Sequence, residues 1–319
     1  MGTTKRRSWK TTDDIPDLVG TVAVVTGANS GLGFVTAREL ARKGATVVMA
    51  CRNAERGEAA RTRVAASLPP NLSDVAVLPL DLADLASVRD FADAVGERFD
   101  GLDILVNNAG VMALPLRRTA DGFEMQMGTN HLGHFALSAL LAPLLLTRPG
   151  ARVVTVASDA HYLGRPDPAD LRFRHGRYRK WRAYGASKSA NLMFAAELAR
   201  RARQSGVDLV SVAAHPGYVD TNLQSAGPRM SGNTRAERAM ALANRLIAAS
   251  PDTGALPQLY AATAPDVENG AFYGPRFSMF GPIAHAPRAP WVRDVVKNRM
   301  LWTASEEATG IRWAPPLGG

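Results

Sequence analysis

The residues whose types and spacing best suit chemistry are Tyr184 and Lys188, a phenol and an ammonium group four positions apart. Residues four apart on a helix share one face, so the two side chains can approach each other. An unperturbed tyrosine has a pKa of about 10 and is a poor acid or base at neutral pH. A nearby positive charge stabilises the phenolate and is expected to lower that pKa. The same spacing is common on solvated helix faces, so the pair needs support from the rest of the chain.

A glycine-rich turn, Thr26-Gly27-Ala28-Asn29-Ser30-Gly31-Leu32-Gly33, separates an apolar run at 22–26 from an amphipathic stretch at about 32–43. Between a strand and a helix, such glycines let the backbone approach a pyrophosphate, which the free N–H groups and dipole of the helix N-terminus would hold. The spacing differs from the usual dinucleotide pattern and from a phosphate-binding P-loop. A purely structural turn also uses glycine, but this position favours a nucleotide site.

Arg52 follows the second apolar run, where an NAD-binding protein would carry an acidic residue for the ribose 2′-hydroxyl. A guanidinium group can instead pair with a 2′-phosphate in bidentate fashion. The sequence therefore favours NADP over NAD, and a solvated strand-end arginine is the alternative.

The elements that must position these residues alternate along the chain. Apolar runs predict strands at 22–26, 45–50, 75–80, 102–106, 151–156 and 207–213, and amphipathic stretches predict helices at about 32–43, 55–66, 85–99, 125–146 and 183–204. Continuous apolar strands separated by helices indicate a parallel sheet buried on both faces, and hence an α/β fold.

One domain is expected from residue 17 to residue 319, after a polar tail at 1–16. No repeat or low-complexity linker divides it, although a split near Arg148-Pro149-Gly150 stays open. Within it we expect a basic insert at 162–182 and a C-terminal extension at about 275–319. A segment at about 218–250, rich in Met and Ala, would cap a pocket or form a surface helix.

The 319 residues, 46% of them hydrophobic and 21% charged, are typical of a globular protein. The single Cys51 excludes an internal disulfide and a cysteine-based metal cage, and no metal is expected. No apolar run reaches the roughly 18 residues of a transmembrane helix, and no secretory signal begins the chain. We therefore expect a cytoplasmic protein.

The net charge of +9 is concentrated between positions 165 and 182, where seven cations face two carboxylates. Because this stretch is a loop rather than a recognition helix, no nucleic-acid partner is expected. A solvated loop is the simple interpretation, and attraction of a cofactor phosphate, an anionic substrate or a membrane surface stays open.

Further residues, in one order along the chain, resemble the motifs of the short-chain dehydrogenase/reductase family. They are Thr26-Gly27-x-x-x-Gly31-x-Gly33, Asp81-Leu82, Asn107-Asn108-Ala109-Gly110, Asn130, Ser158, Tyr184-x-x-x-Lys188 and Pro216-Gly217. The stretches 129–135 and 181–188, with Leu301-Trp302, Ser305-Glu306-Glu307 and Thr309-Gly310, look like its retinol dehydrogenase and protochlorophyllide reductase-like branch. The resemblance implies a Rossmann-type doubly wound parallel sheet of about seven strands flanked by helices.

The resemblance also implies a role for each matching residue. Ser158 would hydrogen-bond a substrate carbonyl oxygen, Tyr184 would be the acid/base, and Lys188 would hold the nicotinamide ribose and lower the tyrosine pKa. Asn130 would help keep a water in a proton relay leading to Lys188. The cofactor would be contacted by Tyr184 and Lys188, by Gly27, Asn29, Ser30, Gly31, Leu32 and Gly33, by Arg52 and Asn53, by Asp81 and Leu82, by Asn108, Ala109 and Gly110, and by Pro216, Gly217 and Thr221.

These roles predict an NADP(H)-dependent oxidoreductase that interconverts a lipophilic alcohol with a ketone or aldehyde. A carbon–carbon double-bond reductase of the same family, or a non-catalytic NADP-binding sensor, is the alternative. The 25 residues at 159–183 form a longer insert than simpler members have, as in the retinol dehydrogenase-like branch. No hydrophobic anchor precedes the domain, so a membrane contact would be peripheral. By analogy, helices at about 120–147 and 183–204 would pair subunits in a dimer or tetramer, and His131 and His134 would pack in the core.

Overall fold

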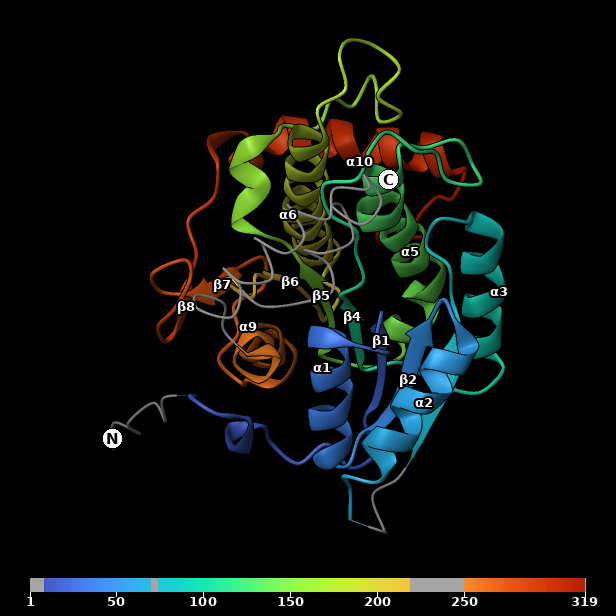
Figure 1. The fold of residues 1–319 in the computed structure, drawn as a ribbon, viewed down its shortest axis with the longest axis vertical. Helices are drawn as coiled ribbons and strands as arrows, with labels where there is room; N and C mark the ends of the chain where they lie inside the picture. Colours follow the sequence, from blue (N-terminus) through green and yellow to red (C-terminus); the bar gives the residue numbers. More distant parts are fainter. Residues whose placement is uncertain (1–8, 70–73, 219–249, 319) are drawn as a thin grey trace, which may run out of the picture.

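Eight strands form one sheet in the order β3-β2-β1-β4-β5-β6-β7-β8 (Figure 1). The computed structural model describes residues 9–69, 74–218 and 250–318. The strands are β1 (Val22–Thr26), β2 (Thr46–Cys51), β3 (Val75–Pro79), β4 (Ile104–Asn107), β5 (Ala151–Val156), β6 (Leu209–Ala214), β7 (Phe272–Pro275) and β8 (Ile283–His285). All neighbouring pairs are parallel except β7 with β8. The predicted doubly wound parallel sheet is confirmed, and the short antiparallel β8 raises the expected count of about seven to eight.

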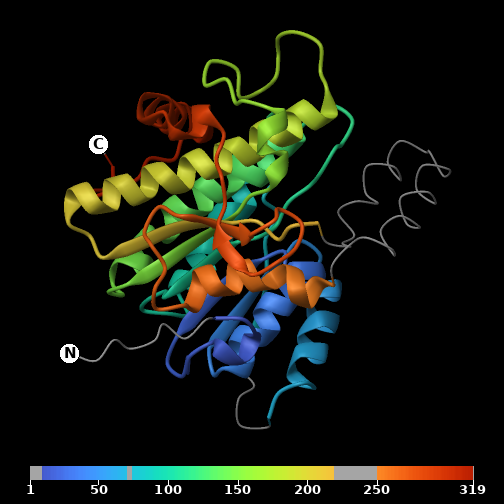
Figure 2. The ribbon, with the colours of Figure 1, turned by 90° about the vertical axis from the view of Figure 1, so that its left-hand side faces the viewer.

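Helices cover both faces of the sheet (Figure 2). A separate hydrophobic core lies under each layer of helices. One face carries α1 (Gly31–Arg42), α2 (Ala54–Ala65) and α9 (Pro251–Thr263). The other carries α3 (Leu85–Gly96), α5 (Gly133–Leu146) and α6 (Lys180–Ser205), with α10 (Val295–Thr309) packed outside them. The short elements are η1 (Thr12–Asp14), α4 (Met125–Met127), η2 (Gly128–Leu132), η3 (Asp159–Leu163) and η4 (Pro290–Arg293). No helix in these described ranges has both the length and the apolarity to cross a membrane.

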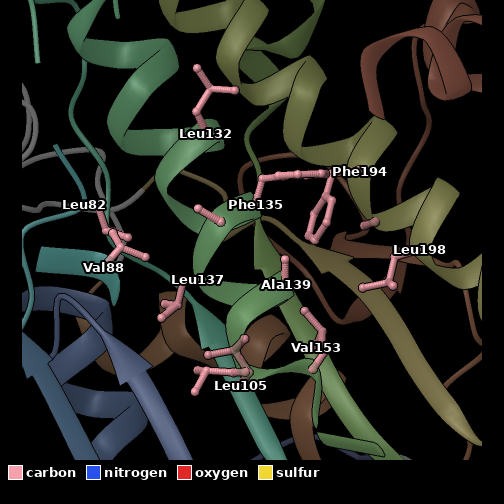
Figure 3. Close-up of a cluster of buried hydrophobic side chains, with 14 of the residues drawn as sticks. Leu82, Val88, Leu105, Leu132, Phe135, Leu137, Ala139, Val153, Phe194 and Leu198 are labelled. Carbon is pink, nitrogen blue, oxygen red and sulfur yellow. The ribbon is translucent and has the colours of Figure 1, made fainter. Parts of the chain in front are cut away.

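The core between the sheet and α5 shows why the apolar runs became buried strands. Leu105 of β4 and Val153 of β5 face Leu137 and Phe135 of α5, and Phe194 of α6 completes the layer (Figure 3). Each of these side chains is at most 3% exposed. Because the opposite face of the same strands packs on α1 and α9, the strands carry apolar residues continuously rather than in alternation.

The predicted helix at 125–146 is interrupted by a π turn, η2, between α4 and α5. The N–H of Gly133 donates to the carbonyl oxygen of Gly128, five residues earlier. Both glycines lie where the chain has no room for a side chain. A Cβ at Gly128 would lie 2.5 Å from Thr119 Cγ2, and one at Gly133 would lie 2.4 Å from the carbonyl oxygen of Leu82. The turn carries Asn130.

The C-terminal helix α10 covers the outer surface of α5 and α6. Its Trp302 is 2% exposed and packs edge-on against Phe135, stacks on Phe194 and contacts Trp313. The guanidinium group of Arg201 lies 4.4 Å from the Trp302 ring centroid and donates to the carbonyl oxygen of Leu317. The two helices suggested for subunit pairing are therefore packed against this chain's own C-terminal segment.

Candidate active site

Ser158 and Tyr184 lie side by side at the carboxyl end of β5. Ser158 caps the N-terminus of η3, where its Oγ accepts a hydrogen bond from the N–H of Ala160 at 3.1 Å. The Tyr184 hydroxyl, brought in by α6, is hydrogen-bonded to the Ser158 side chain. Lys188 follows one turn later, with Nζ 5.9 Å from the Tyr184 ring centroid. Three of the four residues predicted to be catalytic, Ser158, Tyr184 and Lys188, are thus brought together from one strand end and one helix.

Burial dominates the acid–base properties of this pair. Tyr184 is 5% exposed and Lys188 is 3% exposed. Burial raises the pKa of Tyr184 to about 12, although the hydrogen bond from Ser158 opposes this, and it lowers the pKa of Lys188 to about 8. The expected lowering of the Tyr184 pKa by Lys188 is therefore not observed. The reason is geometric, because Lys188 Nζ donates to the carbonyl oxygen of Val156 at 3.0 Å.

The side chain of Asn130 is hydrogen-bonded to the backbone of the segment that follows β4. Its Oδ1 accepts from the N–H of Val111 at 2.7 Å, and its Nδ2 donates to the carbonyl oxygen of Val111 and to Ser187 Oγ, both at 2.9 Å. Ser187 Oγ in turn donates to the carbonyl oxygen of Tyr184. Asn130 is fully buried, so it reaches the site through Val111 and Tyr184, and its part in a water relay stays a prediction.

The glycine-rich turn has the shape of a phosphate cradle. Gly27 and Gly31 have φ of +67° and +57°, which favour glycine. A Cβ at Gly33 would lie 2.5 Å from Asn108 Nδ2, so no side chain fits there. Among the described residues, the side chain of Ser30 makes no capping hydrogen bond to α1, whose first N–H groups thus face the turn. These features fit a bound pyrophosphate.

The hydroxyl group of Thr26 connects this turn to the end of β4 through hydrogen bonds. Thr26 Oγ1 accepts from the N–H groups of Asn108 and Ala109, both at 2.9 Å, and lies 2.9 Å from His134 Nε2. Asn108 Nδ2 also donates to the carbonyl oxygen of Thr26. The predicted core role of His134 is confirmed, and His131 likewise packs inside, 2.9 Å from Ser305 Oγ. In the ranges that the structure describes, no group of three or more His, Cys, Asp or Glu side chains is arranged to hold a metal ion.

Two arginines stand beyond the glycine turn, at the end of β2. Arg52 and Arg56 both line the cavity described below, whereas Asn53 caps α2 by accepting from the N–H of Arg56 at 2.8 Å. Arg56 was not predicted. The sequence signal that could have found it is its position, four residues after Arg52 and in the first turn of the helix that follows the second strand.

A cavity of about 710 Å³ brings most of the predicted residues together. Its wall includes Gly27, Asn29, Ser30, Gly31, Leu32, Gly33, Arg52, Asn108, Ala109, Gly110, Ser158, Tyr184, Lys188, Pro216 and Gly217. Within the described ranges, Asn53, Asp81, Leu82 and Asn130 do not line it. Asp81 accepts from the N–H of Ala83, and Leu82 is buried under Gly133. Thr221 and nearly all of the segment at 218–250 lie outside the described residues.

Residues without a predicted role in the site complete the wall. Val111 and Met112 follow β4, Asp159 follows Ser158, and Trp181 lies in the first turn of α6. Ser278 and Met279 come from the loop between β7 and β8, more than ninety positions after Tyr184. Asp159 is hydrogen-bonded to Ser278, and its Oδ1 lies 3.6 Å from His215 Nε2. Only the fold brings this distant loop to the site.

The basic insert at 162–182 contributes Trp181 alone to the described cavity wall. Arg172 stacks on the ring of Phe123 and donates to the carbonyl oxygen of Asp121. The Tyr178 hydroxyl donates to the carbonyl oxygen of Leu114 or to buried Glu124. The described cations on the cavity wall are instead Arg52, Arg56 and Lys188.

A doubly wound sheet with a phosphate cradle at its switch point and a serine–tyrosine pair opposite it defines a nucleotide-dependent oxidoreductase. The chain belongs to the short-chain dehydrogenase family, whose sequence profile, described as "short chain dehydrogenase", matches residues 21–231. Within that family it belongs to the retinol dehydrogenase-like branch, and it is an enzyme of the class that acts on CH–OH groups.

Three known proteins illustrate the relationship. "Retinol dehydrogenase 12" of Mus musculus is 40% identical over 301 residues, which cover 92% of this chain and 88% of that protein. "Polyprenol dehydrogenase" of Mus musculus is 41% identical over 301 residues, covering 93% and 86%. A solved "Pseudomonas aeruginosa RhlG/NADP active-site complex" is 27% identical, with a TM-score of 0.62 over 81% of this chain and 95% of that one.

Proposed function

We propose that this chain is an NADP(H)-dependent oxidoreductase that interconverts a lipophilic alcohol and its ketone or aldehyde, with Tyr184 as the acid/base. The observation that carries the proposal is the pairing of the Ser158 and Tyr184 hydroxyls on the wall of a cavity that also holds the glycine turn. Two hydroxyl groups converging on one point suit a carbonyl oxygen that gains negative charge.

NADP(H) bound against the glycine turn would supply the hydride for reduction or accept it in oxidation. The Ser158 oxygen already accepts from the Ala160 N–H, so its own hydrogen is left to donate to the substrate or to Tyr184. Tyr184, with its pKa raised to about 12, is protonated at neutral pH and can give its proton to the developing alkoxide. Lys188, whose Nζ lies 5.9 Å from the centroid of that ring, would favour the phenolate that remains if its ammonium group left the carbonyl oxygen of Val156 and turned toward the phenol.

NADP is favoured over NAD because Arg52 and Arg56 lie at the β2 end of the cavity. Two guanidinium groups suit a 2′-phosphate, whereas a carboxylate at this place would suit a 2′-hydroxyl. The solved RhlG/NADP complex is a complex of NADP with a protein of similar fold, which supports this choice.

A lipophilic substrate is favoured by the side chains near Tyr184. Trp181 lies beside the Tyr184 ring, and Val111, Met112 and Met279 also line the described wall and offer mainly apolar surface. Asp159 is the acidic exception, and it is hydrogen-bonded to Ser278. The two relatives are named after retinol and polyprenol, which are both lipophilic alcohols.

The test compares Tyr184→Phe with the wild-type protein on a panel of lipophilic aldehydes, ketones and enones, using NADPH. Removing the proton donor should lower kcat by about 10²- to 10⁴-fold, while the Kd for NADPH changes by less than about threefold. Tyr162→Phe is the matched control, since Tyr162 is 45% exposed and should tolerate the change.

Wild-type-like turnover by Tyr184→Phe would refute the role of the tyrosine. Wild-type protein that reduces enones but no aldehyde or ketone would instead be a double-bond reductase. Tight NADPH binding without turnover on any member of the panel would refute the proposed reaction.

A further inference from the structure

The catalytic serine is tied to the C-terminal segment through a fully buried histidine. His161 lies three residues after Ser158 on η3, with its Nδ1 2.8 Å from the carbonyl oxygen of Ser158. Its Nε2 lies 3.1 Å from the backbone nitrogen of Ala289, just before η4. Both nitrogens of the imidazole therefore have a backbone partner.

These partners determine the protonation of the ring. A carbonyl oxygen only accepts and a backbone N–H only donates, so Nδ1 must carry the hydrogen and Nε2 must be bare. Burial lowers the pKa of His161, which favours this neutral form. The hydrogen bond to the Ser158 carbonyl oxygen and the charge of Asp159 raise this pKa, whereas His215 and Arg288 lower it, as burial does. The N–H of Ala289 thus selects the tautomer that donates to Ser158.

Both ends of the Ser158 residue are held from η3. The Ser158 carbonyl oxygen accepts from Nδ1 and also from the backbone N–H of His161 at 3.0 Å. The Ser158 Oγ accepts from the N–H of Ala160. Rotation of the Ser158–Asp159 peptide would break the two bonds to the carbonyl oxygen and shift the start of η3, whose Ala160 N–H holds the Ser158 hydroxyl. The imidazole blocks that rotation.

A second set of hydrogen bonds connects the same C-terminal stretch to η3, through Trp291 and Ser189. Trp291 Nε1 donates to Ser189 Oγ at 3.0 Å, and Ser189 Oγ lies within 2.9 Å of the carbonyl oxygens of His161 and Gly164. Ser189 follows Lys188 on α6, so these bonds join η3, α6 and η4. The stretch 289–291 therefore holds η3 at two points.

We propose that His161 is a positioning residue for the reaction, and this rests on the proposed function. Its neutral imidazole, with the tautomer set by Ala289, holds the Ser158 hydroxyl against Tyr184. The residues after β8 thereby act on catalysis without touching the substrate. Removing only the donor to Ser158 lowers kcat. It leaves nucleotide binding unchanged, because the glycine turn follows β1 whereas Ser158 follows β5.

Two variants separate the functions of the two ring nitrogens. In His161→Asn the side-chain amide can occupy the place of Nδ1 and keep the donor to Ser158. In His161→Gln the longer side chain can place its carbonyl oxygen near Nε2 and keep the acceptor for Ala289. We expect kcat to fall by less than about fivefold in the Asn variant and by about 10- to 100-fold in the Gln variant, with the NADPH Kd unchanged in both.

A purely structural role would lower the Tm of both variants and would not rank kcat in this order. Equal kcat in the two variants, or a larger loss in the Asn variant, would overturn the inference. A double-mutant cycle sharpens the test, because in a Ser158→Ala background the Gln substitution should change the residual rate by less than about twofold. A full additive loss there would show that His161 does not act through Ser158.

The tautomer can be checked without turnover, from the ¹⁵N chemical shifts of the imidazole in the full-length protein. A protonated Nδ1 and a bare Nε2 are expected, and a hydrogen on Nε2 would overturn the inference. Failure of the wild-type protein to act on any carbonyl would refute the proposed function. An active wild-type protein whose His161→Gln variant keeps full kcat would refute only the role of His161.

Discussion

Replacing Lys188 with Met should stabilise the cofactor-free protein while abolishing its turnover. Lys188 is 3% exposed, and burial lowers the pKa of its ammonium group from 10.5 to about 8. At roughly 1.4 kcal/mol per tenfold change in proton affinity, holding the charge there at pH 7 costs about 3 kcal/mol of folding free energy. The buried lysine is therefore a site where function reduces stability.

The lost hydrogen bond offsets part of this gain. Lys188 Nζ donates to the carbonyl oxygen of Val156, and a hydrogen bond from a charged group contributes about 1.5 to 3 kcal/mol. The carbonyl is not orphaned in the variant, because Asn191 Nδ2 donates to the same oxygen at 3.1 Å. The expected net effect of Lys188→Met at pH 7 is a gain of about 1 kcal/mol.

The gain should disappear as the pH rises. The folded protein holds the lysine proton less tightly than the unfolded chain, so the penalty is complete below the folded pKa of about 8. It fades between that value and the ordinary pKa of 10.5, where both states lose the proton. Above pH 8 the wild-type protein should thus gain stability relative to the variant.

Urea unfolding followed by tryptophan fluorescence, without nucleotide, measures both effects at pH 7 and pH 9.5. Lys180→Met, at an exposed position on the same helix, is the control and should show no such change with pH. A variant less stable than wild type by more than about 1 kcal/mol at pH 7, with a difference that does not change with pH, would refute the reasoning.

Two further predictions concern the cofactor and assembly. Arg52→Glu should lower kcat/KM with NADPH by about 10- to 100-fold while NADH is affected much less, since one charge-assisted pair with the 2′-phosphate is lost and a repulsion is added; equal losses with both nucleotides would contradict the placement. Because Trp302 and the rest of α10 cover α5 and α6, we expect no dimer through those helices, so chemical cross-linking should give no cross-link between two copies of α5, and such a cross-link would contradict this.

The strands and helices were predictable because each local pattern agrees with the fold. Apolar runs of five to seven residues, flanked by glycine or polar turns, became the parallel strands β1 to β6, whose ends lie within two residues of the expected ones. The π turn at Asn130 was not predictable, since the periodicity of 125–146 is that of one apolar helix. It exists because the Asn130 side chain satisfies the backbone of Val111, a contact between distant segments.

The site was predictable where motif residues end neighbouring strands, and not where the wall comes from distant loops. Ser278 and Met279 reach the cavity because β7 pairs with β6 and then turns back into β8. His161 carried no pattern of its own, and its role depends on Ala289, 128 positions away. Such contacts are made by tertiary packing alone.

The tyrosine–lysine pair shows most clearly what spacing can and cannot determine. Four residues on a helix place Lys188 beside Tyr184, as expected, but the direction of the ammonium group is set by the carbonyl oxygen of Val156. The dominant influence on both pKa values is burial, which keeps the phenol protonated and makes the ammonium group of the lysine easier to deprotonate than an exposed one. A protonated Tyr184 is ready to act as an acid in carbonyl reduction at neutral pH, whereas alcohol oxidation requires its phenolate. The balance between the two directions should therefore shift toward oxidation as the pH rises.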